Sequence, residues 1–338
     1  MFTQAFLSEY FGQFDYWEVP NVTVLGNEWL LLSEGNIFPD YFTSLSPGTN
    51  TTRNLRLLRA ATEFTSSNKN NLKELLELRK ISVESSFLLG CTYNYYHYVF
   101  DVLPRLKIYL ELFPGMQYPM LTSSKSIRDA SSFQYQWLRF LQLPESSLLG
   151  ISSCENIESV PRLFCANVRK DLIFGDSHGS KYSQISWLRQ TVRKRLNLEC
   201  HHHRYNSKIF ISRAPTSSAR LKNQSEVEAF MHKSGYEVLY FERLPLKEQL
   251  FAVINAEKIA GLPGAGMANA LFCSDTCNVH QIVENSRNPI YVSNKTLGWC
   301  KRKDLNRRML LNDYAYYARY FKFMGIDYSV VQAKDFTG

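Results

Sequence analysis

The sequence has little of what marks a membrane-spanning, secreted or zinc-stabilised protein. No run reaches the ~18 consecutive apolar residues that are needed to cross a bilayer. The opening residues, MFTQAFLSEYFGQFDYWEV, show neither the basic start nor the apolar stretch of a signal peptide. The seven cysteines are scattered, with no paired CxxC units at zinc spacing. We therefore expect reduced thiols and a cytoplasmic location.

Internal repeats and low-complexity tracts are also missing from the sequence. With 45% hydrophobic and 21% charged residues, the composition is typical of a folded globular chain. Its 338 residues are enough for two domains, each with a core of its own.

The net charge of +8 is a modest basic excess that suits an anionic ligand. Nucleotide diphosphates, an anionic membrane surface and nucleic acid all fit that description. A nucleic-acid partner rests on charge alone, because the aromatic residues lie in apolar helical contexts rather than between basic residues. We therefore expect no nucleic-acid binding.

The first half of the chain alternates strand and helix patterns after an irregular start. The segments NVTVLG and EWLLLS predict a hairpin, and NLKELLELRK (71–80) predicts a helix. A stretch rich in Ser, Pro, Gly and Asn over 144–180 predicts the crossing to a second domain. We place an N-terminal α/β domain at 1–175.

The second half, 176–300, reads as repeated βα units. Each apolar, β-rich run, such as KIFISR and KIAGL, is followed by a helical pattern. Ser225 and Glu228 have the spacing of a capping box that opens one of these helices. Repeated βα units of this length predict a parallel, doubly wound sheet. The remaining 301–338 predict a helical tail, either packed back on the first domain or facing an anionic bilayer.

The stretch GLPGAGMANALF, Gly261–Phe272, follows a predicted strand and opens a predicted helix. Free amides at a helix start, with glycines that allow close approach, form a phosphate site. Close packing of helix on sheet also needs glycine, so this turn alone decides nothing. Arg213, Arg220 and Glu284 are predicted at the same carboxyl edge of the sheet. Arginine binds phosphate and a carboxylate can bind ribose, which favours a nucleotide site.

In the first half, the segment CTYNYYHYVFD places Asn94, His97 and Asp101 on one helical face. A carboxylate four residues from an imidazole raises its basicity and fixes its orientation. The pair predicts a general base for an alcohol nucleophile. The alternative is a half-buried histidine without a catalytic role.

Metal binding has weak support in the sequence. The three consecutive histidines at 201–203 cannot all face one ion on a helix or strand. A DxD-like pair in a suitable loop is missing. We therefore expect no metal and no cofactor.

Together these segments resemble glycosyltransferase family 61, the former DUF563 group. Its aromatic-rich N-Y-x-H-x-x-x-D/E motif matches Asn94–Asp101, followed by LPRL. In the second half, a strand ending in ISR, the loop Arg220, an N-x-x-E helix start and an EQ pair match in order. The family's G-x-H-G-A-G-x-x-N turn matches GLPGAGMAN, except that Pro263 stands where the family has histidine.

The resemblance implies a GT-B architecture, with two Rossmann-like domains and a cleft between them. It implies an inverting, metal-independent transfer from a nucleotide-sugar to a glycan, lipid-linked or other hydroxyl acceptor, as in surface polysaccharide synthesis. The N-terminal domain would take the acceptor and the C-terminal domain the donor. Because proline offers no donor group at position 263, the alternative is a catalytically reduced nucleotide-sugar-binding protein.

The expected roles divide between the two domains. His97, oriented by Asp101, or Asp101 itself, would remove the acceptor proton. The expected substrate- or donor-binding residues are Asn94, Arg213, Arg220, Gly264, Ala265, Gly266, Asn269 and Glu284. Arginines and backbone amides would stabilise the charge that develops on the leaving diphosphate.

Overall fold

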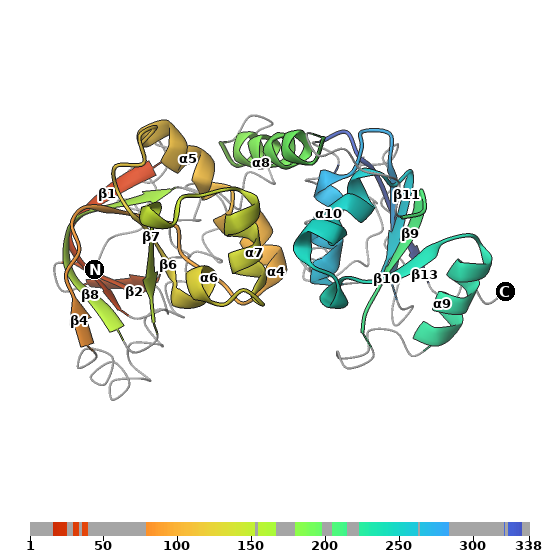
Figure 1. Cartoon of the computed structure of the whole chain (residues 1–338), viewed down its shortest axis with the longest axis horizontal. Coiled ribbons are helices and arrows are strands. Elements are labelled where there is room, and N and C mark those ends of the chain that lie inside the picture. Colours follow the sequence, from red (N-terminus) through yellow and green to blue (C-terminus); the bar gives the residue numbers. More distant parts are fainter. Residues whose placement is uncertain are drawn as a thin grey trace, which may run out of the picture. The chain divides into compact units, whose positions relative to one another are not determined.

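The structure is a computed structural model that divides into two compact units, Met1–Leu188 and Arg189–Gly338 (Figure 1). It describes residues 16–25, 30–33, 36–39, 79–152, 155–166, 180–197, 205–214, 223–262, 264–283, 321 and 324–332. The predicted domain boundary after residue 175 lies outside these residues. The division between the units falls within helix α8, Ser180–Asn197.

The first unit is built on a mixed sheet in the order β3-β2-β1-β8-β5-β6-β7, with β4 paired to β8. Its strands are β1 Tyr16–Leu25, β2 Leu30–Ser33, β3 Asn36–Pro39, β4 Arg79–Ile81, β5 Ser86–Leu88, β6 Met120–Ser123, β7 Leu148–Ile151 and β8 Glu155–Ala166. The helical elements are α4 Tyr95–His97, the π-helical segment η3 Tyr98–Val102, α5 Arg105–Leu112, α6 Ser124–Arg128, α7 Phe133–Phe140 and the 3₁₀ turn η4 Glu145–Ser147.

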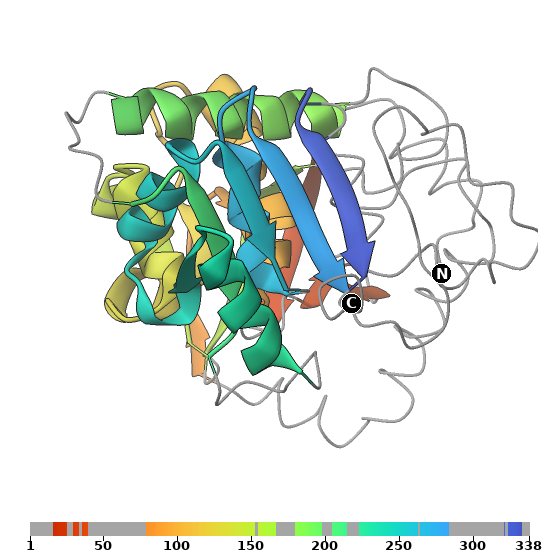
Figure 2. The ribbon, with the colours of Figure 1, turned by 90° about the vertical axis from the view of Figure 1, so that its right-hand side faces the viewer.

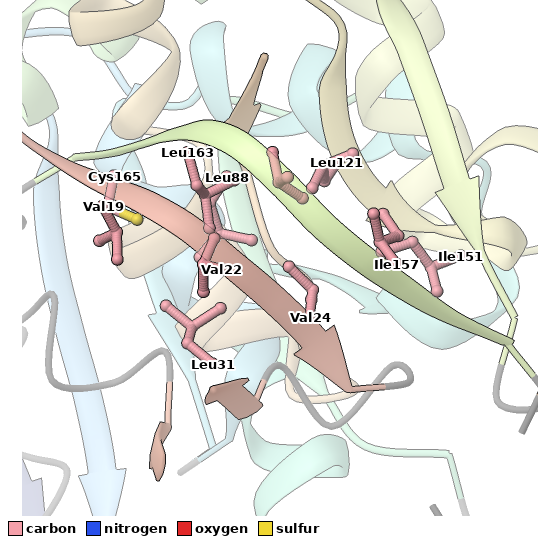
Figure 3. Close-up of a cluster of buried hydrophobic side chains, with 11 residues drawn as sticks. Val19, Val22, Val24, Leu31, Leu88, Leu121, Ile151, Ile157, Leu163 and Cys165 are labelled. Carbon is pink, nitrogen blue, oxygen red and sulfur yellow. The ribbon is translucent and has the colours of Figure 1, made fainter. Parts of the chain in front are cut away.

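The long strand β8 organises this sheet. It pairs antiparallel with β1 and parallel with β4 and β5, so it joins a hairpin region to a parallel region. Apolar side chains from β1, β2, β5, β6, β7 and β8 pack in one buried cluster around it (Figure 3). The cluster consists of Val19, Val22, Val24, Leu31, Leu88, Leu121, Ile151, Ile157, Val160, Leu163 and Cys165.

Two expectations for the first unit have different outcomes. The predicted hairpin is confirmed, because β1 and β2 pair antiparallel with Thr23 opposite Leu32. The predicted helix over 71–80 is wrong at its end: Arg79–Ile81 is strand β4, while 71–78 lie outside the described residues. Pairing with β8 over Glu155–Ile157 accounts for the strand, and helical periodicity cannot anticipate such a distant partner.

The second unit contains a five-stranded sheet in the order β10-β9-β11-β12-β13. Every neighbouring pair is parallel, as the repeated βα pattern predicted, and Figure 2 shows the strands pointing the same way. The strands are β9 Lys208–Ser212, β10 Glu237–Tyr240, β11 Lys258–Gly261, β12 Asn278–Val283 and β13 Asp327–Gln332. The helices are α9 Gln224–Lys233, α10 Leu246–Ile254 and the 3₁₀ helices η6 Phe241–Arg243 and η7 Ala265–Phe272.

The strand order creates a switch point between β9 and β11. From β9 the chain moves outward to β10 and then returns past β9 to β11, so the next connections run the other way. Helix α9 lies on one face of the sheet and α10 on the opposite face (Figure 1). In open parallel sheets, ligands bind beyond the carboxyl ends of the two strands that flank such a point. Here those ends are Ser212 and Gly261.

Two expectations for the second unit are corrected. The capping box is wrong, because α9 begins at Gln224 with Asn223 as its N-cap, so Ser225 lies inside the helix. The helical tail is wrong over Asp327–Gln332, which forms β13 beside β12. An α/β fold is therefore established for both units, whereas the GT-B cleft stays a prediction.

Candidate active site

The glycine turn lies at the switch point of the second sheet. It follows β11, whose end is tied to β9 by a hydrogen bond from the Leu262 amide to the Ile211 carbonyl at 3.0 Å. Arg213 follows β9 directly. A Cβ atom placed on Gly264 would be 2.6 Å from Nη1 of Arg213. The guanidinium therefore lies against the backbone of the turn, and the missing side chain at Gly264 allows that approach.

Hydrogen bonds through Asn269 hold the 3₁₀ helix η7, which follows the turn, in place. Asn269 has no exposed surface, and its Nδ2 donates to Oε1 of Gln249 on α10 at 2.7 Å. Gln249 in turn donates Nε2 to the carbonyls of Phe241 and Leu244, both at 2.8 Å. Asn269 thus joins η7 to α10 and to the loop after β10. Donor binding by Asn269 stays a prediction, whereas its contacts show that it holds the turn in place.

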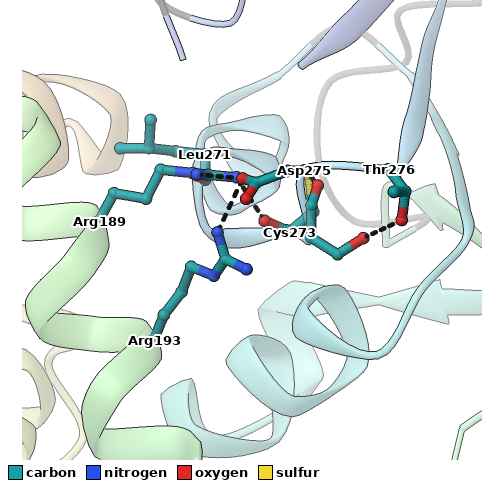
Figure 4. A network of polar contacts seen from close by, with 7 residues as sticks. Arg189, Arg193, Leu271, Cys273, Asp275 and Thr276 are labelled. Carbon is teal, nitrogen blue, oxygen red and sulfur yellow. Dashed lines mark hydrogen bonds and ion pairs between the residues drawn. The ribbon is translucent and has the colours of Figure 1, made fainter. Parts of the chain in front are cut away.

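A second anchor holds the far end of η7 (Figure 4). Arg189 on α8 is 7% exposed and donates to the carbonyls of Leu271 at 2.7 Å and Cys273 at 2.6 Å. It also pairs with Asp275 at 2.7 Å, as Arg193 does at 2.8 Å. Arg189, followed by Arg193, lowers the pKa of the Asp275 carboxyl. Carbonyls at the end of a helix need such donors, so Arg189 acts as its C-terminal cap.

The first unit contains a second candidate site, a hydrogen-bonded pair of polar side chains. His97 Nδ1 is 2.7 Å from Oδ2 of Asp101, and the two side chains are 43% and 9% exposed. An ionised carboxylate accepts here, so Nδ1 carries the proton and Nε2 is the acceptor nitrogen. The buried Asp101 carboxylate orients the imidazole ring, and His97 is the solvent-accessible member of the pair. The pair therefore has the arrangement of a histidine base with an orienting acid.

The local backbone explains how this pair forms. Asn94 is the N-cap of α4, and its Oδ1 accepts from the His97 amide at 3.3 Å. After one short turn the helix widens into the π-helical segment Tyr98–Val102, which carries Asp101. Arg105 is 3% exposed and binds the carbonyls of Asp101 at 3.0 Å and Leu89 at 3.1 Å. Arg105 therefore ties the π segment to the end of β5. Such π segments occur often at functional sites.

The residues predicted from sequence fall into four groups. The structure brings Arg213 together with Gly264, and His97 together with Asp101. Asn94, for which substrate binding stays a prediction, caps the helix that carries His97. Ala265 and Gly266 lie in the first turn of η7, partly exposed. The positions outside the described residues are Arg220, Pro263 and Glu284.

Sequence reasoning missed the residues that hold these sites in place. Arg105 and Arg189 are buried cations, but their sequence contexts read as an ordinary helix start and a basic helical face. Glu228 was assigned to a capping box, although its carboxylate reaches β9 and β10. The signal that was available is a charged residue among apolar neighbours, which also occurs on many solvated helices.

In the part of the chain that the structure describes, no three His, Cys, Asp or Glu side chains lie close enough together to hold a metal ion. The helices in the same ranges include none of the length and apolar character that a bilayer crossing requires.

Comparison with known proteins adds one match. The family model for Glycosyltransferase 61 matches residues 95–280, more than half of the chain. A comparison with curated proteins returns no match. The matched range begins within the helix that carries His97 and ends in β12, so it covers the His97–Asp101 pair, Arg213 and the glycine turn. The chain belongs to glycosyltransferase family 61.

Proposed function

We propose that this glycosyltransferase moves a sugar from a nucleotide-sugar donor to a hydroxyl of its acceptor, by an inverting and metal-independent reaction. The observation that carries the proposal is the contact between the Arg213 guanidinium and the backbone of Gly264. It lies at the switch point of a parallel sheet, where nucleotides bind in related folds. A cation and free backbone amides at one point suit a diphosphate.

The donor site would stabilise the leaving group. When the bond between the sugar and the diphosphate breaks, negative charge develops on the phosphate oxygens. Arg213 is a permanent cation with a forked donor geometry, and the amides at the start of η7 point outward from the helix. Preorganised donors of this kind stabilise developing charge without reorganisation. In the proposed donor site, Arg220 supplies a second cation. The Glu284 carboxylate accepts hydrogen bonds from the ribose hydroxyls.

The acceptor side uses His97 as general base. Nε2 takes the proton of the acceptor hydroxyl while its oxygen forms a bond to the anomeric carbon. The bond from that carbon to the diphosphate breaks, and the nucleoside diphosphate leaves with the electron pair. One displacement of this kind inverts the configuration. The smaller exposure of Asp101 favours His97 as the base and Asp101 as its orienting group.

The experiment combines a nucleotide screen with a transfer assay. The purified chain is heated with each common nucleoside diphosphate, and the one that raises Tm identifies the base. Nucleotide-sugars with that base are then tested for release of nucleoside diphosphate, in wild type and in His97→Ala. His232→Ala, an exposed histidine on α9, is the matched control. We expect the loss of a general base to lower the rate by about 10²–10⁴-fold. Full activity of His97→Ala would refute the base assignment.

The second candidate is a protein that binds a nucleotide-sugar without transferring it. Pro263, in the position of the family's histidine, is the observation that favours it. The same experiment separates the two. If the chain binds the nucleotide but releases nucleoside diphosphate slowly with every donor and acceptor pair, the second candidate is supported. Transfer that depends on His97 supports the first.

A further inference from the structure

We propose that Glu228 is a positioning residue of the donor site, which holds the end of β9 so that Arg213 stays against the glycine turn. This inference rests on the proposed donor site. Glu228 is not a residue of that site itself; it lies on α9, one helical turn after Gln224.

The Glu228 carboxylate gathers donors from two strand ends and from its own helix. Its Oε1 accepts from the Ser212 hydroxyl and from Nε2 of Gln224, the latter at 2.8 Å. Its Oε2 accepts from the Tyr240 hydroxyl at 3.0 Å. Ser212 ends β9 and Tyr240 ends β10. One side chain therefore joins the carboxyl ends of two neighbouring strands.

Gln224 carries this connection to Arg213. Besides Glu228, its Nε2 lies 2.8 Å from the Arg213 carbonyl and 3.2 Å from the Ser212 hydroxyl. Ser212 is only 2% exposed, so its bonds form where water cannot replace them. The backbone at Ser212 and Arg213 is thus fixed on the α9 side of the sheet. The guanidinium of Arg213 meets Gly264.

A carboxylate is the group that this position requires. It accepts only, and the partners at Ser212, Gln224 and Tyr240 can all donate. A glutamine at 228 would replace one of the two acceptor oxygens by an NH2 group, which would then face the Nε2 donor of Gln224 or the hydroxyl of Tyr240. The pKa of the Tyr240 hydroxyl is raised, first by burial and then by its bond to Glu228, so the phenol stays protonated and able to donate. The capping-box interpretation gives Glu228 none of these partners.

The test uses inorganic pyrophosphate and the nucleoside diphosphate that stabilises the chain most. Affinities are measured by calorimetry for wild type, Arg213→Gln, Glu228→Gln and the double variant. Glu257→Gln is the control for charge, because Glu257 is exposed and precedes β11 at the opposite end of the sheet. Tyr240→Phe removes one donor only and serves if Glu228→Gln does not fold.

We expect Glu228→Gln to weaken both probes by about fivefold to tenfold, as the loss of hydrogen bonds in the supporting network suggests. Tyr240→Phe should weaken them less, and Glu257→Gln should bind like wild type. The double variant should bind no more weakly than Arg213→Gln, because Glu228 acts through Arg213. If Glu228→Gln weakened binding through a general loss of stability, its effect would instead add to that of Arg213→Gln.

The outcomes separate the two proposals. If Arg213→Gln weakens binding while both Glu228→Gln and Tyr240→Phe bind like wild type, Glu228 has no positioning role and the donor site stands. Additive effects in the double variant also overturn the positioning role. If wild type binds neither probe, the donor site fails, and the positioning role fails with it because no anion is bound.

Discussion

The substitution Arg189→Met removes the anchor at the end of η7 and keeps an unbranched side chain of similar length. In the structure, the guanidinium binds two backbone carbonyls, those of Leu271 and Cys273, and one carboxylate, that of Asp275. The carbonyl bonds are buried, whereas the Asp275 side chain is 67% exposed. The substitution therefore distinguishes the value of the buried bonds from that of the ion pair.

The two hydrogen bonds to backbone carbonyls should account for most of the lost free energy of unfolding. A hydrogen bond from a charged donor contributes about 1.5–3 kcal/mol, and two buried carbonyls would lose their partner. An ion pair with an exposed carboxylate contributes less than about 1 kcal/mol. We expect Arg189→Met to lower the free energy of unfolding of the second unit by about 3 kcal/mol. For a unit of this size, Tm should fall by roughly 6–12 °C.

Urea denaturation, followed by circular dichroism, measures this change. Asp275→Asn is the matched variant, since it removes the ion pair and leaves both carbonyl bonds in place. We expect it to cost less than about 1 kcal/mol. Equal losses in the two variants would show that the exposed ion pair carries the stability, which would refute the reasoning.

Three further predictions concern single side chains. Gly264→Ala places a methyl group against the Arg213 guanidinium and should weaken nucleoside diphosphate binding about tenfold in a calorimetric titration, with little change in Tm; unchanged affinity would contradict the cradle. Asn269→Ala leaves Oε1 of Gln249 without its amide donor and should lower the free energy of unfolding by about 1–3 kcal/mol in urea; no loss would contradict the anchor. Burial raises the pKa of Tyr109 from 10.0 to about 12, so its stabilising contribution is complete below pH 10 and is lost as the pH rises through 12. Tyr109→Phe should therefore lose less stability over that interval in pH-dependent thermal melts, and identical pH profiles would contradict the assignment.

The second unit could be predicted well because its signals are local. Each of its first four strands is a short apolar run, and a helical pattern follows each of the first three. Parallel strands joined in this way have few possible arrangements, so the sequence alone predicts which residues lie at the carboxyl edge. The sequence therefore predicts Arg213 and Gly264 at one edge, and the structure brings the two together.

The first unit was harder to predict because its strands pair with segments that are distant in the sequence. In the sheet, Glu18 of β1 lies opposite Phe164 of β8, and β4 pairs with the beginning of β8. Register between segments so far apart is set by the packing of both faces, which a local pattern does not contain. The strand at Arg79–Ile81 was therefore assigned to a helix.

The supporting residues escaped prediction for a related reason. Glu228 has the spacing of a capping box, yet tertiary contacts with Ser212 and Tyr240 outweigh that local role. Arg189 reaches Leu271 across most of the second unit's sequence. Chemistry-bearing residues could be recognised by type and position, whereas the residues that hold them depend on contacts between distant segments.

The most direct test of the central claim is a calorimetric titration of the stabilising nucleoside diphosphate into wild type and Arg213→Gln. Lys258→Gln is the control, because Lys258 begins β11 at the opposite edge of the sheet from Gly264. If Arg213 and the glycine turn hold the diphosphate, wild type and the control bind alike and Arg213→Gln binds at least tenfold more weakly. Equal affinity in all three proteins would contradict the account.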